Sequence, residues 1–212
     1  MTNARAPIPH ILRRAAYLGR ALRDDSRAMA AVEAALILPV ALTMFALLLY
    51  GAEAFDAQRK VTLTARTVTD LITQTSSPVL VMVSGVPSVP QSSIDSDLSY
   101  ASCVMTPFSS CPTASSSLTM LATEVQINSN QTTAKVIWSE PFNGATARTA
   151  GSTVTLPTGL GTGQQGNYFI MGEVDYVYTP LNLYTPTTAL TLHDTIYLTP
   201  RAAAQLNMLV GQ

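Results

Sequence analysis

Charged side chains are scarce in this chain of 212 residues, since Asp, Glu, Lys and Arg make up only 12% of it. A soluble domain usually has about a quarter. The net charge is -1, so no bulk positive field favours nucleic acid as a partner. Hydrophobic residues reach 47%. One membrane span and a second half rich in Ser, Thr, Asn and Gln account for this composition.

Residues that bind metals or catalyse reactions are also few. His10 and His193 are the only histidines, and Cys103 and Cys111 the only cysteines. A zinc site needs further ligands close to the cysteines, and no nearby histidine supplies one. His193, beside Asp194, is interpreted as a solvated strand position because no nucleophile stands with it in a recognisable motif. We therefore predict no catalytic residue, no metal site, no cofactor and no enzymatic activity.

Three glycines, Gly161, Gly163 and Gly166, have the spacing of the G-x-G-x-x-G dinucleotide-binding fingerprint. That fingerprint requires a strand before it and a helix after it. Here no strand is predicted before it, and the segment that follows, residues 168–178, has the alternating pattern of a strand. We interpret the glycines as a loop.

An apolar run at residues 28–50 is the longest hydrophobic segment of the chain. A helix that crosses a bilayer needs about 20 such residues, so we predict a transmembrane helix at 29–52. Pro39 lies inside it and should kink the helix locally without breaking it. Glu33 is its one acid. Burying a lone carboxylate in a membrane span costs a few kcal/mol of free energy unless another group pairs with it.

The leader at residues 1–28 carries six arginines against two acids, Asp24 and Asp25. The arginines are Arg5, Arg13, Arg14, Arg20, Arg23 and Arg27. The positive-inside rule then keeps the leader in the bacterial cytoplasm and exports the C-terminal part. Residues 8–23 form either a weak amphipathic helix on the membrane or an unstructured leader. A cleaved secretory signal is the alternative, because Ala52-Glu53-Ala54 has the small-x-small pattern of a signal peptidase site.

The helical pattern continues beyond the membrane run, because no Gly or Pro occurs from Ala52 to Ser77. We predict one helix from about Asp25 to Gln74, in which residues 53–77 form a periplasmic extension. The exported domain then covers residues 78–212.

Short strand-like segments dominate the exported domain. A hairpin is the clearest, because the turn-forming residues 128–132 separate two apolar runs. We predict an α+β fold in which an antiparallel sheet packs on the outer half of the helix. The predicted strands are 79–83, 118–127, 134–138, 167–178 and 191–198, with a Ser/Pro-rich loop up to Ser117 and a polar loop at 141–166. Cys103 and Cys111 lie in the first loop with seven residues between them, and we predict a disulfide there rather than two free thiols.

Glu33 has two interpretations. If the chain is cut before Met29, the new amine lies about one helical turn from Glu33. In an assembly of such helices, the amine of one subunit would neutralise the carboxylate of its neighbour and set the axial register. Alternatively, Glu33 lies at headgroup depth, where it is protonated or hydrated.

The opening of the helix resembles a known family. Residues 30–39, Ala-Ala-Val-Glu-Ala-Ala-Leu-Ile-Leu-Pro, follow Asp-Asp-Ser-Arg-Ala at 24–28, and the combination is similar to the start of TadE-like proteins. These are pseudopilins or minor pilins of the bacterial Tad (Flp) type IVc pilus. Residues 173–180 and 196–201 look like the two closing strands of that family.

The resemblance implies cleavage by a prepilin peptidase between Ala28 and Met29, and it gives Glu33 the place of the family's acid at mature position five. Gly typically stands where this chain has Ala28, and Phe or Tyr often stands where it has Ala34. Some relatives stay uncut in the inner membrane. The resemblance therefore implies either a processed subunit or an uncut accessory protein.

The expected function is assembly or priming of a Tad pilus by a single-span minor pilin or pseudopilin. The expected partners are other pilins through the N-terminal helix, the prepilin peptidase, the Tad inner-membrane assembly platform and the lipid bilayer. The alternative is a membrane-anchored binding or adhesin module outside any pilus. A third possibility, an envelope enzyme, would be tested by substituting His193.

Overall fold

The computed structural model describes residues 26–74, 81–111, 113–179, 189–201 and 203–209. The chain divides into two compact units, Met1–Gly51 and Ala52–Gln212. The longest element, helix α2 (Ser26–Thr73), begins in the first unit and ends in the second.

Helix α2 agrees closely with the predicted helix from about Asp25 to Gln74. It continues through Pro39 without a break. Its last turn closes where the backbone N–H of Gln74 donates to the carbonyl of Asp70 at 3.0 Å. The residues that were expected to stop it, 76–78, lie outside the described part of the chain.

The second unit contains a five-stranded sheet whose order is β5-β4-β3-β6-β7, and all of its pairings are antiparallel. The strands are β3 (Leu118–Ile127), β4 (Thr133–Phe142), β5 (Thr153–Thr155), β6 (Tyr168–Tyr178) and β7 (Leu190–Leu198). The predicted α+β class and the hairpin with its turn at 128–132 are confirmed, although β4 is longer than the predicted 134–138.

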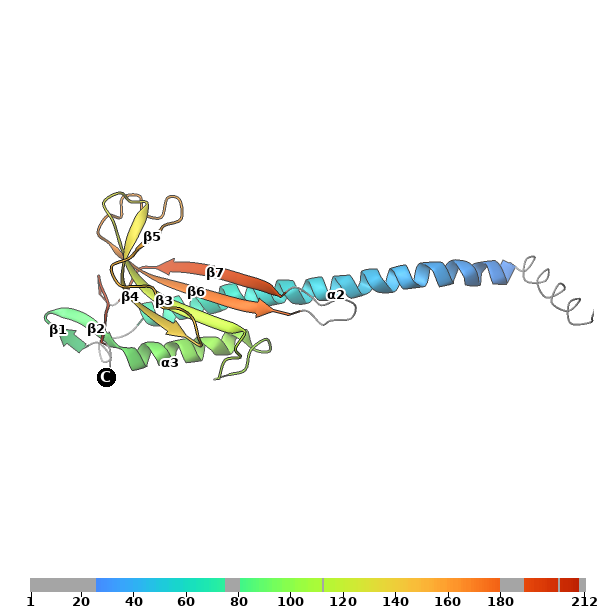
Figure 1. Cartoon of the computed structure of the whole chain (residues 1–212), viewed down its shortest axis with the longest axis horizontal. Coiled ribbons are helices and arrows are strands. Elements are labelled where there is room, and N and C mark those ends of the chain that lie inside the picture. Colours follow the sequence, from blue (N-terminus) through green and yellow to red (C-terminus); the bar gives the residue numbers. More distant parts are fainter. Residues whose placement is uncertain (1–25, 75–80, 112, 180–188, 202, 210–212) are drawn as a thin grey trace, which may run out of the picture. The chain divides into compact units, whose positions relative to one another are not determined.

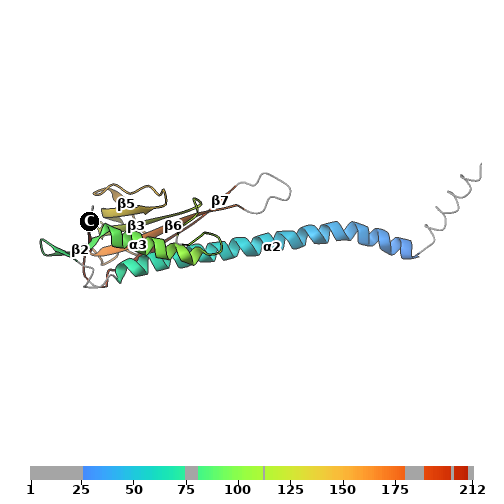
Figure 2. The same cartoon turned by 90° about the horizontal axis from the view of Figure 1, so that it is seen from below.

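One face of this sheet is covered by the part of α2 that belongs to the second unit. Figures 1 and 2 both show strands β6 and β7 alongside it. Five residues of α2 form a buried stripe at helical spacing and share one core with β3 and β6. They are Ala57, Val61, Ala65, Val68 and Ile72. This arrangement confirms the prediction that the sheet packs on the outer half of the helix.

A glycine permits the close approach of α2 and β6. A Cβ atom on Gly172 would lie 2.3 Å from the hydroxyl oxygen of Thr69 and 3.2 Å from the carbonyl oxygen of Ala65. The first distance is far inside ordinary contact distance and the second is slightly inside it, so any larger residue requires Thr69 to rotate or the helix and the strand to move apart.

The Ser/Pro-rich loop that we predicted up to Ser117 is wrong in part, because it contains strand β2 (Val86–Pro90), helix α3 (Gln91–Ser102) and the 3-10 turn η1 (Cys103–Met105). Helix α3 buries Ile94, Leu98 and Ala101 at helical spacing. Five serines and two acids dilute this stripe, so the segment looks like a loop in sequence. Pro90 directly precedes the helix, where proline is tolerated.

Two further strands were also missed. Strand β5 lies inside the loop predicted at 141–166, and β8 (Asn207–Leu209) follows the segment that we predicted to be the last strand. Strand β8 joins a second sheet of order β1-β2-β8, where β1 is Val81–Val83. The β2–β8 pairing is parallel, so the antiparallel description holds only for the five-stranded sheet and for β1–β2. Strands β5 and β8 have three residues each, too few to show a period.

A smaller apolar cluster lies near the turn of the β3–β4 hairpin, apart from the main core. Strand β3 has an irregular register between Glu124 and Val125 where it pairs with β4. Beyond this point the buried side chains belong to a separate group. Its members are Val125, Ile127, Ala134, Val136, Leu156 and Phe169.

Candidate functional site

The first half of α2 is covered with exposed apolar side chains. Every large hydrophobic residue from Met29 to Leu49 exposes more than half of its surface, up to 72% at Leu48. The exposed residues are Met29, Val32, Leu36, Ile37, Leu38, Val40, Leu42, Met44, Phe45, Leu47, Leu48 and Leu49. Their positions cover the whole circumference of the helix, which is typical of a helix surrounded by lipid or by other apolar helices.

Within the described residues, α2 is the one helix long and apolar enough to cross a membrane, and its apolar window has no buried residue. A core helix of a soluble protein would bury such a window. The structure therefore agrees with anchoring by a helix near the N-terminus.

Glu33 lies in this apolar part of α2 and is exposed. Among the residues whose side chains are described, none forms a salt bridge or a hydrogen bond with it. Helical geometry places Met29 and Glu33 one turn apart on the same face. Ala28 also lies in α2, but its side chain is outside the described part. Cleavage between Ala28 and Met29 and the assembly role of Glu33 stay predictions.

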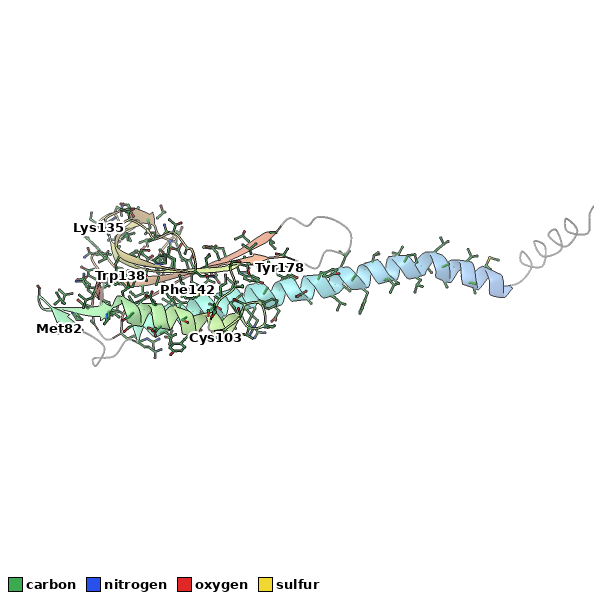
Figure 3. All side chains as sticks on the ribbon, turned by 60° about the horizontal axis from the view of Figure 1, so that its bottom comes forward. Met82, Cys103, Lys135, Trp138, Phe142 and Tyr178 are labelled. Carbon is green, nitrogen blue, oxygen red and sulfur yellow. A yellow bond between two sulfur atoms is a disulfide. The ribbon has the colours of Figure 1, made fainter. Side chains whose placement is uncertain are left out.

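The predicted disulfide between Cys103 and Cys111 is present, with Cα atoms 4.8 Å apart. The turn that it closes is attached to the sheet through Phe108. The ring of Phe108 packs edge-on against Tyr176 of β6, with centroids 6.2 Å apart, and its carbonyl accepts a hydrogen bond of 3.1 Å from the Tyr176 hydroxyl. Figure 3 shows Cys103 beside the end of α3.

The face of the sheet directed away from α2 carries a polar chain that sequence reasoning missed. His193 bonds Asp175 of β6 through Nδ1 at 2.7 Å and Thr195 through Nε2 at 2.9 Å. Asp194, the neighbour of His193 in the sequence, points to the opposite face and accepts a hydrogen bond from Thr62 of α2. Neighbouring residues of a strand face opposite sides. The acid that contacts His193 is therefore Asp175, on the adjacent strand β6.

The order carboxylate, imidazole, hydroxyl is also that of a hydrolytic triad. The side chain of His193 is 51% exposed and that of Asp175 is 46% exposed. An exposed pair of this kind contributes little to stability. We keep the interpretation of His193 as a solvated strand position, and the absence of catalysis stays a prediction.

An ion pair lies on the same face. Arg148 donates to both carboxylate oxygens of Glu173, at 2.6 and 3.0 Å. The Glu173 side chain is only 12% exposed. These hydrogen bonds raise the pKa of Arg148 above its ordinary value, and burial opposes this rise. The pair therefore holds the segment after β4 against the sheet.

The glycine loop at 161–166 docks on the β3–β4 turn. The backbone N–H of Gly163 donates to the side-chain oxygen of Gln131 at 3.0 Å. A Cβ atom on Gly161 would lie 2.1 Å from the carbonyl oxygen of Gln131. Strand β6 follows the loop, so the context differs from that of a dinucleotide fingerprint, which needs a helix there.

One buried acid was not singled out from the sequence. Glu124 of β3 is completely buried, and burial raises its pKa to about 8, although the hydrogen bond from the Leu206 backbone and the nearby indole N–H of Trp138 oppose the rise. The available signal was a single acid within the apolar strand 118–127.

No protein-family model matches the chain, and neither a curated protein nor a solved structure matches it.

Proposed function

We propose that this protein is a single-span minor pilin or pseudopilin that takes part in assembly or priming of a Tad (Flp) type IV pilus. The observation that carries the proposal is the apolar surface around α2 from Met29 to Leu49, which includes one acid, Glu33. A helix of this kind is stable among lipids or among similar helices. The resemblance of residues 24–39 to the opening of TadE-like proteins supports the same role.

The disulfide supports the proposed orientation. Disulfides persist in oxidising compartments such as the bacterial periplasm and are rare in the cytosol. The Cys103–Cys111 bond therefore favours an exported second unit. The six arginines of the leader favour a cytoplasmic N-terminus. Both point to the same topology, in the inner membrane before any entry into a fibre.

Glu33 gives the proposed assembly step its physical basis. After cleavage, the amine of Met29 on one subunit would pair with Glu33 of a neighbour and offset the cost of burying each charge. Because the two charges sit at fixed positions about one turn apart on each helix, the pairing would also select one axial register.

The mass of the mature N-terminus tests the proposal most directly. A chain that starts at Met29 supports a processed pseudopilin, and Ala28→Gly, which restores the typical residue of the family, should be cut at least as well. An intact chain in the membrane supports the uncut accessory form or the alternative described below. A chain that starts at Phe55 would overturn membrane anchoring.

Piliation of cells that lack the gene is the second test. We expect few or no pili, restored by the wild-type gene but not by Glu33→Ala. Glu53→Gln serves as the matched control, because it removes an acid beyond the predicted span of the same helix. Normal pili in the deletion strain would refute the assembly role.

A membrane-anchored binding or adhesin module is the alternative. The observation that favours it is the β1–β2 hairpin, in which Val81, Met82 and Val83 expose 42–64% of their surface. Figure 3 shows Met82 on this hairpin. Exposed apolar residues next to one another often mark an interaction site. Loss of adhesion in Met82→Ser cells that keep normal pili would favour this alternative.

A further inference from the structure

Two strands hold a single residue of the C-terminal segment from both sides. The Oε1 atom of Glu124 accepts a hydrogen bond from the backbone N–H of Leu206 at 2.7 Å. The indole N–H of Trp138 donates to the carbonyl oxygen of Leu206 at 2.6 Å. Glu124 on β3 and Trp138 on β4 lie directly opposite each other. Both polar groups of the Leu206 backbone are thus satisfied by side chains of the hairpin.

Leu206 connects the C-terminal segment to the rest of the second unit. Its side chain is fully buried in the main core. Strand β8 starts at the next residue and pairs with β2, which leads directly into α3. Arg201 anchors the segment upstream, because its backbone N–H donates to the carbonyl of Thr73 at 3.0 Å and its side chain pairs with Asp70 at 2.7 Å. Arg201 is thus held by the end of α2, independently of the contacts that hold Leu206.

Only one of the two carboxyl oxygens of Glu124 takes part in the contact with Leu206. Among the described residues, no group forms a hydrogen bond with Oε2 of Glu124, although this atom is buried. A carboxylate at this position would be desolvated on one side, whereas a protonated acid is neutral and still accepts the Leu206 N–H through Oε1. Burial of a charge without a partner is costly, and the group gains its proton instead.

The groups that face Glu124 are uncharged. Trp138 lies opposite on β4, Ile170 lies opposite on β6, and the third contact is the Leu206 backbone. The nearest acid on that face of β4 is Glu140, which accepts hydrogen bonds from Gln91. The residues that α2 and α3 bury are also uncharged. No described cation therefore stabilises an ionised Glu124 while the segment is closed.

We propose that Glu124, Trp138 and Leu206 form a proton-dependent latch, which holds residues 203–209 closed while Glu124 is protonated and opens to give its carboxylate access to water. The latch does not depend on the proposed pilus function. Opening would free β2 of its parallel partner and expose the side of the core next to α3.

Amide hydrogen exchange of the full chain in detergent, measured between pH 5 and 9, tests the latch. After correction for the intrinsic exchange rate, opening of residues 203–209 should rise about tenfold per pH unit from about pH 5 to pH 8 and then level off. The amides of β6 should exchange at least about tenfold more slowly at each pH. A flat profile, or opening of residues 203–209 that is no more frequent than opening of β6, would overturn the proposal.

Three variants separate the latch from general stability. Glu124→Gln keeps an acceptor for Leu206 but cannot ionise, so its profile should be flat. Trp138→Phe should increase opening at every pH and leave the slope unchanged. Glu140→Gln removes a neighbouring buried acid and should keep the wild-type profile. The latch is refuted if Glu124→Gln retains the slope or if Glu140→Gln abolishes it.

A second measurement applies even if Glu124→Gln fails to fold. Trp138 is the only tryptophan of the chain, and its fluorescence should titrate in the wild type with a midpoint near pH 8, where the closed carboxyl ionises. Emission that stays constant from pH 5 to 9 would contradict the proposal.

Discussion

Gly172→Ala should disturb the close contact between β6 and α2. The new methyl group would lie 2.3 Å from the Thr69 hydroxyl oxygen, whereas ordinary contacts are longer than about 3.4 Å. Thr69 is fully buried and donates its hydroxyl to the carbonyl of Ala65 at 2.7 Å. To make room, either Thr69 gives up this hydrogen bond by rotating, or helix and strand move apart.

Either response should lower the free energy of unfolding by about 1–3 kcal/mol, the usual cost of overpacking a filled core. Thr69→Ala removes the atom that clashes. We therefore expect Gly172→Ala to cost at least about 1 kcal/mol less in a Thr69→Ala background than alone. Such coupling is expected for residues in direct contact.

Urea unfolding of the full chain in detergent, followed by Trp138 fluorescence, measures these free energies. Thr69→Val is the matched control, because valine has almost the shape of threonine but lacks the hydroxyl. It should leave the cost of Gly172→Ala nearly unchanged. Additive effects in the Thr69→Ala background, or relief of equal size with Thr69→Val, would refute the steric account.

Three other predictions concern the second unit. Reducing the Cys103–Cys111 disulfide should lower stability by about 2–3 kcal/mol, from the entropy of a short closed loop, and paired unfolding curves with and without reductant measure this loss. Stability should fall by about 1.4 kcal/mol per pH unit as pH rises from 4.5 towards 8, because the unfolded chain then loses the Glu124 proton that the folded chain keeps; Glu124→Gln should remove this slope. Arg148→Ala should cost about 1–2 kcal/mol by leaving the largely buried Glu173 unpaired, and adding Glu173→Gln should recover part of that loss in the same urea assay.

Long periodic elements could be predicted from the sequence. Helix α2 and strands β3 and β6 agree with the expected ranges within a few residues. Each is long enough for its apolar pattern to appear several times. Helix α3 was missed because three buried residues among many serines are a weak signal. Strands β5 and β8 owe their conformation to partners that lie far away in the sequence.

Some contacts at the candidate sites could be predicted from the sequence, and others could not. Cys103 and Cys111 could be paired from the sequence because they are the only two cysteines, eight positions apart. The contact between His193 and Asp175 could not be predicted, since it depends on the register of β6 and β7. The hydrogen bonds that hold Leu206 come from Trp138 and Glu124, which lie 68 and 82 positions away in the sequence.

The amino-acid sequence alone determined the parts of this protein that depend on local composition: an apolar helix of membrane-spanning length, one acid within it, and an antiparallel hairpin. Only the tertiary structure decided which polar groups face each other, which acid lost access to water, and where glycine was required. The reason is that periodicity and hydrophobicity act between near neighbours, whereas burial and hydrogen bonding depend on strand register and on segments that meet only after folding.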